Sequence, residues 1–356
     1  MQKRGSIVKK FDYSFLDDGL LPAKLINITG NIYSLRTAQE IRKVDFAKVF
    51  TELEAVAKIQ SVKCSNAIEG IVTSDSRILD IVNKNSAPLN HDEEEIAGYR
   101  DALNIVHTEY EHLSFNEQDI LRLHEMMMSF VGYEHGGKYK TSDNVILEVG
   151  VDGSRRVRFR PTPASETATA MEQLELAYLE ACSNPHINQL LLIPCVILDF
   201  LCIHPFQDGN GRISRLLSLL LLYKNGFDVG KYVSFEEQIN RFKDLYYEAL
   251  KQSSKGWNEN ENDYFPFINN FLSTLYFCYK ELDKRFAVVH GKRVTKSARI
   301  EATVLGSLTP ISKRDICNIH PDISPSTVEA VLGLMVKSGS IRKTGASRST
   351  KYIRNS

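Results

Sequence analysis

Two strongly apolar segments lie close together in the second half of the chain. They read NQLLLIPCVILDFLCI (residues 188–203) and SRLLSLLLLY (residues 214–223). Each is apolar on nearly every face, which is typical of a helix buried on all sides in a protein core. Both are shorter than the roughly 20 residues that a membrane-spanning helix needs. We therefore expect two central core helices, joined by the short polar run HPFQDGNGRI.

This polar run combines residue types that bind phosphate. Successive backbone N–H groups in the Gly209–Gly211 turn can form a concave anion site, and the start of the next helix adds partial positive charge. Arg212 and Arg215 project from one side of that helix, and guanidinium forks match phosphate oxygens. Asp208 is placed to hold Mg²⁺, and His204 to accept a proton. The run predicts a phosphoryl- or nucleotidyl-transfer site; the alternative is an Asn-Gly turn between core helices, with solvated or paired arginines.

Composition places the chain among globular proteins. It has 356 residues, 43% hydrophobic and 25% charged, with a formal net charge of zero, so bulk charge predicts no polyanion partner. This length predicts two or three domains. We interpret Cys182, Cys195 and Cys202 as buried free thiols, which fits a reducing compartment. The first residues lack the apolar stretch of a signal peptide, and we expect a cytoplasmic protein with no membrane partner.

Periodicity along the rest of the chain is mostly helical. Apolar positions recur at helical spacing through residues 36–68 and through NEQDILRLHEMMMSF. The segment DNVILEVGVDGSRRVRFRP differs, because β-branched residues around the Asp152–Gly153 pair predict a short β-hairpin. The expected fold class is therefore mainly α. We divide it into an N-terminal helical region (residues 1–110), a core (residues 111–285) and a small C-terminal domain (residues 286–356).

The run that starts at His204 resembles the Fic family motif HPFx[D/E]GNGRxxR and matches each of its fixed positions. The resemblance implies an all-helical Fic fold with a short β-hairpin flap. It also implies transfer of AMP from ATP to a hydroxyl side chain of a target protein. The roles it implies are these: His204 is the base, Asp208 holds Mg²⁺, Gly209, Asn210, Gly211 and Arg212 form the anion hole, and Arg215 binds the γ-phosphate.

Two further stretches agree with this resemblance. GKYK, which ends at Lys140, resembles the family's GxYR turn, with lysine in place of the usual arginine. The hairpin would be the flap that clamps the target, where Phe159 either presses on the target residue or is an ordinary strand aromatic. NRFKDLYYEAL resembles the helix that closes the nucleotide site; Tyr246 and Tyr247 lie near the adenine or belong to the core.

A second motif, CSNAIEGI, lies far upstream. Ser65 and Glu69 are four residues apart on one helix face, and Gly70 is a plausible residue just after a helix end. Next to a Fic core, the stretch resembles the family's inhibitory motif [S/T]xxxE[G/N]. In that resemblance Glu69 pairs with Arg215 and takes the place of the γ-phosphate. The alternative is a helix end with a surface glutamate.

The C-terminal segment is basic. Residues 291–356 hold twelve Lys or Arg and four Asp or Glu, a net charge of +8. Two helices, the second beginning after the cap residue Ser324, and then a basic hairpin resemble a winged helix. Such a domain binds DNA through its second helix and wing, with Arg342, Lys343 and Arg348 as phosphate contacts, or it binds a partner protein.

Two classes of function remain open at this point. One is a self-inhibited protein adenylyltransferase with ATP, Mg²⁺ and a target protein as its partners; the other is a DNA-binding regulator whose Fic core only senses nucleotide. A sensor would need the anion site but no base, so His204 favours the enzyme. Phosphoryl transfer, removal of AMP from a modified target, and pairing with a second copy of the chain remain alternatives.

Overall fold

The computed structural model describes residues 9–132, 136–149, 154–287, 296–307, 310–320, 323–345 and 350–355. The chain folds into two compact units. The larger unit contains the chain up to Thr73 and the segment Ile78–Lys280, and the smaller one contains Ser74–Arg77 and the chain from Glu281 onward. Most of the expected N-terminal region and core thus lies in the larger unit, except Ser74–Arg77 and residues 281–285. A domain boundary near residue 110 remains a prediction.

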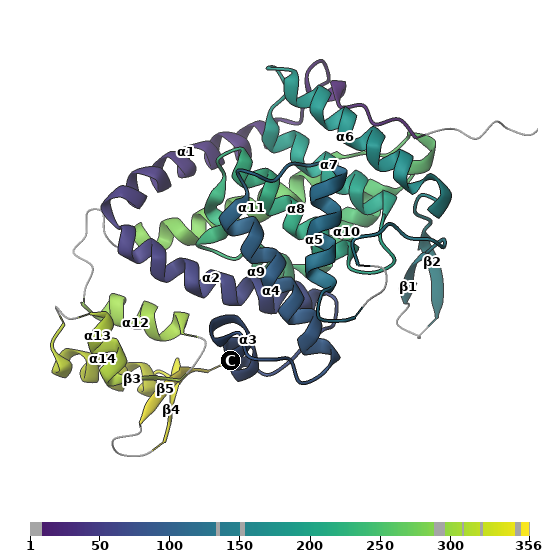
Figure 1. Ribbon diagram of the computed structural model, residues 1–356. Coiled ribbons are helices and arrows are strands. Elements are labelled where there is room, and N and C mark those ends of the chain that lie inside the picture. Colours follow the sequence, from purple (N-terminus) through teal and green to yellow (C-terminus); the bar gives the residue numbers. More distant parts are fainter. Residues whose placement is uncertain are drawn as a thin grey trace, which may run out of the picture. The chain divides into compact units, whose positions relative to one another are not determined.

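The larger unit is a helical bundle with one small hairpin (Figure 1). Its α-helices are α1 (Ala23–Asp45), α2 (Ala47–Ile68), α3 (Asp75–Lys84), α4 (His91–Glu109), α5 (Glu117–Met128), α6 (Thr167–Ser183), α7 (Gln189–Ile203), α8 (Asn210–Lys224), α9 (Phe235–Arg241), α10 (Lys243–Ser254) and α11 (Phe265–Ala287). The first residues of α3 and the last residues of α11 belong to the smaller unit. Its strands are β1 (Ile146–Val149) and β2 (Arg155–Phe159). The mainly α fold class predicted from the sequence is confirmed.

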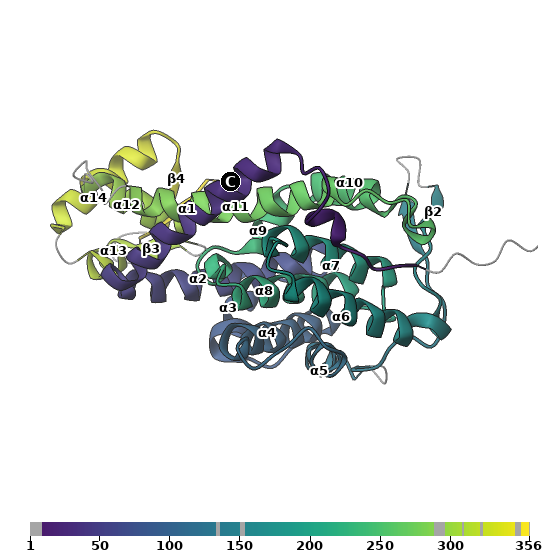
Figure 2. The same cartoon turned by 90° about the horizontal axis from the view of Figure 1, so that it is seen from above.

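Helices α7 and α8 form the centre of this bundle. Thirteen of the fifteen residues in each helix are buried, which confirms the two core helices predicted from the apolar segments. α7 packs on α6, α8 and α10, while α8 also packs on α4 and α5. Figure 2 shows this layering, with α4 and α5 on one side of the central pair and α10 and α11 on the other. Because both helices are covered, the loop between them is held on each side by packed core.

The hairpin joins β1 to β2 in antiparallel register, with Glu148 opposite Arg156 and Val149 opposite Arg155. Its predicted Asp152–Gly153 turn lies outside the described residues. Two-stranded ribbons are marginal on their own. This one is attached to the bundle through the ring of Phe159, which packs edge-on against Trp257.

The smaller unit has its own core. It contains α12 (Lys296–Gly306), β3 (Ile311–Ser312), α13 (Lys313–Ile319), α14 (Pro325–Lys337), β4 (Ile341–Thr344) and β5 (Lys351–Arg354), with the strands in the order β3-β5-β4. Ser324 caps α14 by accepting from the backbone N–H of Thr327. The buried face of α14 consists of Val328, Val331, Leu332 and Met335. The sequence interpretation missed α12, and Arg348 lies outside the described residues.

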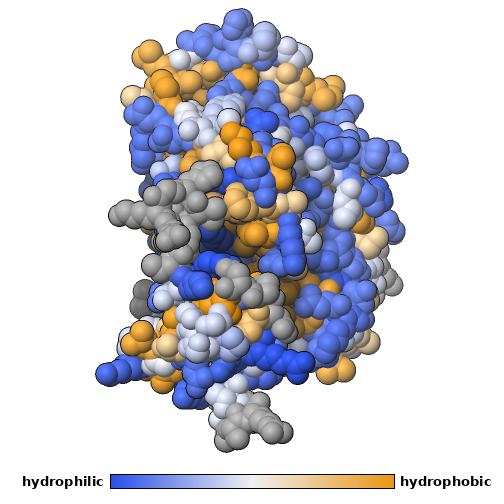
Figure 3. All heavy atoms as spheres, turned by 90° about the vertical axis from the view of Figure 1, so that its left-hand side faces the viewer, coloured by the Kyte–Doolittle hydropathy of each residue, from blue (hydrophilic) through white to orange (hydrophobic). Residues whose placement is uncertain are grey.

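Apolar and hydrophilic side chains are interspersed on the face that Figure 3 shows. The face in Figure 3 is mostly hydrophilic, with apolar side chains in small groups. None of the helices in the described segments is long and apolar enough to cross a membrane. Cys195 and Cys202 are buried free thiols as predicted, but Cys182 is exposed. That part of the prediction was wrong because Cys182 lies on the outward side of α6 at its last turn.

Candidate active site

The loop between α7 and α8 is fixed by its own backbone. His204 ends α7 in the left-handed region, with a φ of 54°, and Gly209 precedes α8 with a φ of 80°. The side chain of Asn210 braces the loop from inside: its Oδ1 accepts from the N–H of Phe206 at 2.9 Å, and its Nδ2 donates to the carbonyl of Phe206 at 2.8 Å. The side chain of Asn210 is therefore committed to the loop, and only its backbone N–H is left for an anion.

The first turn of α8 points unpaired donors at this loop. Helix geometry leaves the first N–H groups of any helix without an intrahelical partner, and here these belong to Asn210, Gly211 and Arg212. The carboxylate of Glu69 lies against this turn, and a Cβ added at Gly211 would collide with its Oε1. A negatively charged group therefore already lies beside the helix start that the sequence predicts to bind phosphate.

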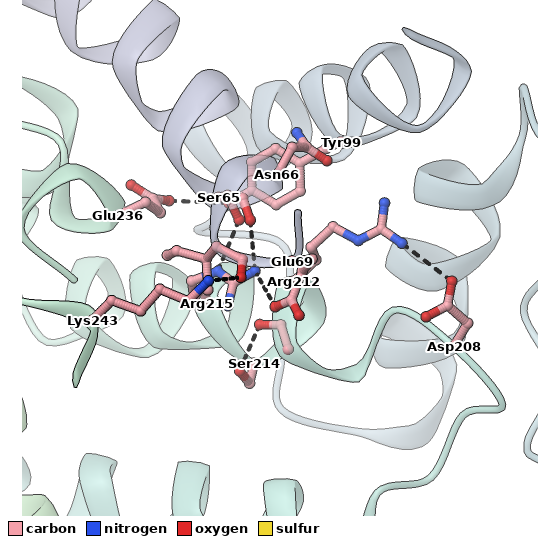
Figure 4. Close-up of polar contacts among 12 residues, drawn as sticks. Ser65, Asn66, Glu69, Tyr99, Asp208, Arg212, Ser214, Arg215, Glu236 and Lys243 are labelled. Atoms are coloured by element: carbon pink, nitrogen blue, oxygen red, sulfur yellow. Dashed lines mark hydrogen bonds and ion pairs between the residues drawn. The ribbon is translucent and has the colours of Figure 1, made fainter. Parts of the chain in front are cut away.

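Arg215 is buried in α8 and contacts the end of α2. Its Nη2 donates to Glu69 Oε1 at 2.8 Å and to the carbonyl of Ser65 at 2.8 Å, while its Nε donates to Ser65 Oγ at 2.8 Å. Figure 4 shows Ser65 and Glu69 directed from α2 at this guanidinium. Burial opposes the charge, but the adjacent Glu69 carboxylate raises the pKa of Arg215 above its ordinary value. The ion pair between Glu69 and Arg215 is present in the structure.

The position of Glu69 follows from the way α2 ends. Gly70 takes a φ of 87°, the N–H of Gly70 donates to the carbonyl of Ala67, and the N–H of Ile71 donates to the carbonyl of Asn66. These are the two bonds of a Schellman end, which needs a residue tolerant of positive φ at the position of Gly70. Glu69 is thus the last residue before the chain leaves the helix. Its side chain stays one-third exposed.

Arg212 points away from Arg215, toward Asp208 (Figure 4). It forms ion pairs with Glu95 of α4 and with Asp208, whose Oδ2 is 3.4 Å from Nη2. The side chain of Arg212 is only 2% exposed. Its Nε and Nη1 have no hydrogen-bond partner among the described residues. Buried donors without partners are costly, and a bound anion would satisfy them.

His204 is a neutral imidazole in this setting. Burial lowers the pKa of His204 to about 4, helped by the charge of Lys140 and opposed by the carbonyl of Leu201 and by Glu69 and Asp208. Its Nδ1 lies 3.3 Å from the Leu201 carbonyl. That contact favours the tautomer with the proton on Nδ1, which leaves Nε2 as the acceptor.

Asp208 offers a carboxylate that is half exposed. Its backbone carbonyl is held by His124 Nε2 at 3.2 Å, and the His124 ring stacks on Phe206 at 3.7 Å. In the described part of the chain, no three His, Cys, Asp or Glu side chains gather into a metal site. A lone exposed carboxylate beside an anion site fits Mg²⁺, which is usually held by one or two carboxylates together with substrate phosphates.

The aromatic residues predicted for the site lie in different places. Tyr246 is buried, and its ring packs edge-on against Tyr247 at 5.5 Å and Phe267 at 5.9 Å. Burial is the largest cause that raises the pKa of Tyr246, to about 12, and Arg215 and Glu69 also act on it. Both tyrosines of α10 thus lie near the Glu69–Arg215 pair. Phe159 packs against Trp257, so this packing supports its interpretation as a structural aromatic.

Sequence reasoning missed two residues that shape the site. Glu95 pairs with Arg212 from α4, and His124 holds the loop at Asp208 from α5. Neither has a local signal, because each is a polar residue on an otherwise ordinary amphipathic helix. Only the packing of α4 and α5 against α8 brings them to the motif.

The chain resembles known proteins along this same region. Residues 114–222 match the model of the Fic/DOC family. A Fido domain-containing protein of Dictyostelium discoideum is 31% identical over 139 residues, which are 38% of this chain and 94% of that protein. A protein adenylyltransferase Fic of Nematostella vectensis is 26% identical over 221 residues; the match spans 60% of this chain and 45% of that protein. The crystal structure of a Fic family protein from Desulfovibrio desulfuricans G20 has the same fold, with a TM-score of 0.61 at 21% identity, over 94% of this chain and 97% of that one.

Proposed function

This chain belongs to the Fic/DOC family, and we propose that it is a protein adenylyltransferase that moves AMP from ATP to a side-chain hydroxyl of a target protein. One observation carries the proposal. A neutral imidazole lies at the end of α7, and the N–H groups at the start of α8 follow it across a loop whose backbone is fixed. A base beside a phosphate site is what nucleotidyl transfer to a hydroxyl needs.

Each residue then has a chemical task. His204 Nε2 takes the proton of the target hydroxyl as its oxygen bonds to the α-phosphorus. The bond from that phosphorus to the bridging oxygen of the β-phosphate breaks, and pyrophosphate leaves. The N–H groups at the start of α8 stabilise the negative charge of the phosphates. Nε and Nη1 of Arg212, which have no hydrogen-bond acceptor among the described residues, do the same. These donors are fixed before substrate binds, which makes them effective in the transition state.

Asp208 is the residue that would hold Mg²⁺ with the phosphates of ATP. The ion supplies charge neutralisation at those phosphates and fixes their geometry. The chain's own contribution is the position of the carboxylate, which His124 sets by binding the Asp208 carbonyl.

The Glu69–Arg215 pair supports auto-inhibition of this activity. We propose that Arg215 binds the γ-phosphate in the active state and that Glu69 occupies this position in the resting state. The 2.8 Å contact between Nη2 and Oε1 satisfies the guanidinium with a carboxylate where a phosphate oxygen would otherwise bind. The target would be held as an extended segment that pairs through its main chain with the β1–β2 hairpin.

The reaction class is tested by the position of the label in ATP. We expect the Glu69→Gly variant to incorporate label from α-³²P-ATP into itself or into added protein, and none from γ-³²P-ATP. His204→Ala in the same background is the control for the base. Incorporation from γ-labelled ATP alone would show phosphoryl transfer instead, and loss of preloaded AMP without ATP would show the reverse reaction. Nucleotide binding with no incorporation in any variant would favour the sensor.

A further inference from the structure

His204 occupies a backbone conformation that needs support. Its φ of 54° is unfavourable for a residue that carries a Cβ. The direction of the imidazole depends on the peptide groups on either side of it. Whatever holds those two peptide groups therefore decides where the base points.

Lys140 contacts the peptide group before His204 and the second peptide group after it, between Pro205 and Phe206. Its backbone N–H donates to the carbonyl of Pro205 at 2.8 Å, and its Nζ donates to the carbonyl of Ile203 at 3.1 Å. These two carbonyls belong to the residues immediately before and after His204. A single residue thus bonds to the chain on both sides of the base, once through its main chain and once through its ammonium group.

A second side chain completes the arrangement. Asn144 Oδ1 accepts from Lys140 Nζ at 3.0 Å, and Asn144 Nδ2 donates to the carbonyl of Phe206 at 3.2 Å. Lys140 is buried, with 4% of its surface exposed. Its charge lies at the carboxyl end of α7, where a cation interacts favourably with the helix dipole.

We propose that Lys140 is the positioning residue of the base: by bonding to the carbonyls on both sides of His204, it fixes the imidazole against the hydroxyl to be modified. The inference rests on the proposed function for its kinetic consequences and on the contacts alone for its structural ones. The family resemblance puts arginine at this place. Lysine makes a difference here, because an ammonium can lose its proton and a guanidinium cannot.

The charge of this clamp should titrate at mildly alkaline pH. Burial lowers the pKa of Lys140 to about 8, opposed by Asp143 in the same segment. His204 faces it from α7, and Glu69 and Asp208 act on His204 in turn. Above about pH 8 the amine is neutral and bonds the Ile203 carbonyl more weakly. We therefore expect AMP transfer to decline as the pH rises through this value.

The stability of the folded chain should change with pH in the opposite direction to its activity. The unfolded chain keeps Lys140 protonated up to its ordinary pKa, while the folded chain loses the proton near pH 8. Between these values the unfolded state binds more protons, so the contribution of Lys140 to stability increases as the pH rises. Activity and stability thus change in opposite directions over one pH window, which a general loss of structure would not produce.

The kinetic test uses Glu69→Gly protein and self-modification from α-³²P-ATP between pH 6.5 and 9.5. We expect Lys140→Met to lower kcat at least tenfold and to leave the KM for ATP within about twofold. Lys140→Arg should restore kcat and remove the alkaline decline. Lys138→Met, an exposed lysine on the same turn, is the matched control. Wild-type kcat in Lys140→Met, or the same alkaline decline in Lys140→Arg, would overturn the proposal.

A second measurement does not depend on any activity. In hydrogen exchange, the peptide covering residues 200–206 should exchange faster in Lys140→Met than in wild type, because His204 loses its support. Lys140→Arg should exchange like wild type. Unchanged exchange in Lys140→Met would overturn the clamp even if AMP transfer is found. If no variant transfers AMP, the proposed function fails, while the exchange result still decides whether Lys140 holds the loop.

Discussion

In the proposed reaction the imidazole of His204 would act as the proton acceptor, because burial lowers its pKa to about 4. An exposed histidine would be partly protonated near neutral pH and would lose part of its basicity. Buried His107 and His124 also have lowered pKa values, at about 3 and about 4. Protonation state alone therefore does not single out the base. A ring nitrogen with no hydrogen-bond partner among the described residues favours His204: both ring nitrogens of His124 are engaged, by the carbonyl of Asp208 and the N–H of Gly137.

We predict that His204→Ala abolishes AMP transfer and leaves ATP affinity within about threefold. In the proposed mechanism the imidazole would act on the incoming hydroxyl, whereas α8 and the arginines would bind the phosphates. Calorimetry beside a labelling assay in the Glu69→Gly background measures both. His186→Ala, an exposed histidine at another place, is the control. Label transfer that persists without His204, or a loss of ATP binding, would contradict its assignment as the base.

Asp208 gives a second prediction at this scale. Asp208→Ala should lose the Mg²⁺ dependence of ATP binding together with activity, because a single carboxylate can hold Mg²⁺ only when substrate phosphates complete its shell. Asp208→Asn keeps the shape and removes the charge, and should behave in the same way. Titration of ATP with and without Mg²⁺ measures the effect. If ATP binding by Asp208→Ala responds to Mg²⁺ as that of wild type does, the carboxylate supports the loop structure and does not bind Mg²⁺.

At the scale of elements, the site depends on the contact between the end of α2 and the start of α8. Ser65 and Glu69 occupy one face of α2 because they are one helical turn apart, and the Schellman end at Gly70 stops the helix directly after Glu69. Lys243 of α10 donates to the carbonyl of Ile68 and ties a third helix to the same end. Glu69 is thus held in place by the ends of two other elements.

We predict that Glu69→Gly increases self-modification at least tenfold. Removing one partner of a hydrogen-bonded charge pair costs about 2–5 kcal/mol, and the low end applies because Glu69 is one-third exposed. The unfolding temperature of the variant should therefore be lower than that of wild type without ATP. ATP and Mg²⁺ should restore it, because Arg215 then binds the γ-phosphate.

Two further variants distinguish inhibition by Glu69 from a purely structural role of Glu69 at the end of α2. Glu52 is an exposed residue of α2 that does not pair with Arg215. The Glu52→Gly variant destabilises the helix through the glycine and should not increase self-modification. Arg215→Ala loses both the inhibitory carboxylate and the phosphate contact, and should stay inactive. Should Glu69→Gly label no faster than wild type at saturating ATP, Glu69 is merely the C-cap residue of α2.

The sequence allowed the α7–α8 pair, the loop motif, the hairpin and the end of α2 to be predicted, because each has a local signal: an apolar period, a turn residue or a fixed spacing. It did not reveal Glu95, His124 or the contacts of Lys140. Those depend on which helices pack together, and a polar residue on an amphipathic helix looks the same whether it faces solvent or a buried arginine. Helix α12 was missed for a related reason: of its described residues, only Ile300 and Val304 are fully buried side chains in the core of the smaller unit, which is a weak local signal.

At the scale of the whole molecule, charge is distributed unequally. Residues 291–356 carry a net +8, and the remainder of the chain balances it. Within the smaller unit the exposed basic side chains include Arg342 and Lys343 on β4, and Lys351 and Arg354 on β5. α14 offers much less positive charge: its exposed Glu329 is paired with Lys313, and its exposed Leu334 is apolar. If this unit binds nucleic acid, the strands and not the helix would contact the phosphates.

That arrangement predicts DNA binding with a steep salt dependence and little sequence preference, because phosphate contacts release counterions but do not read bases. Fluorescence anisotropy with a 30-base-pair duplex, from low to physiological salt, should give a slope of log K against log salt of about −0.9 for each phosphate contacted. The double variant Arg342→Ala, Lys343→Ala should lose about two phosphate contacts, and its slope should be less steep by the corresponding amount. Glu329→Ala on α14 is the control and should not weaken binding. If the full chain binds no duplex even at low salt, the alternative of a protein partner is left, and the exposed Leu334 on α14 is the first residue to substitute in testing it.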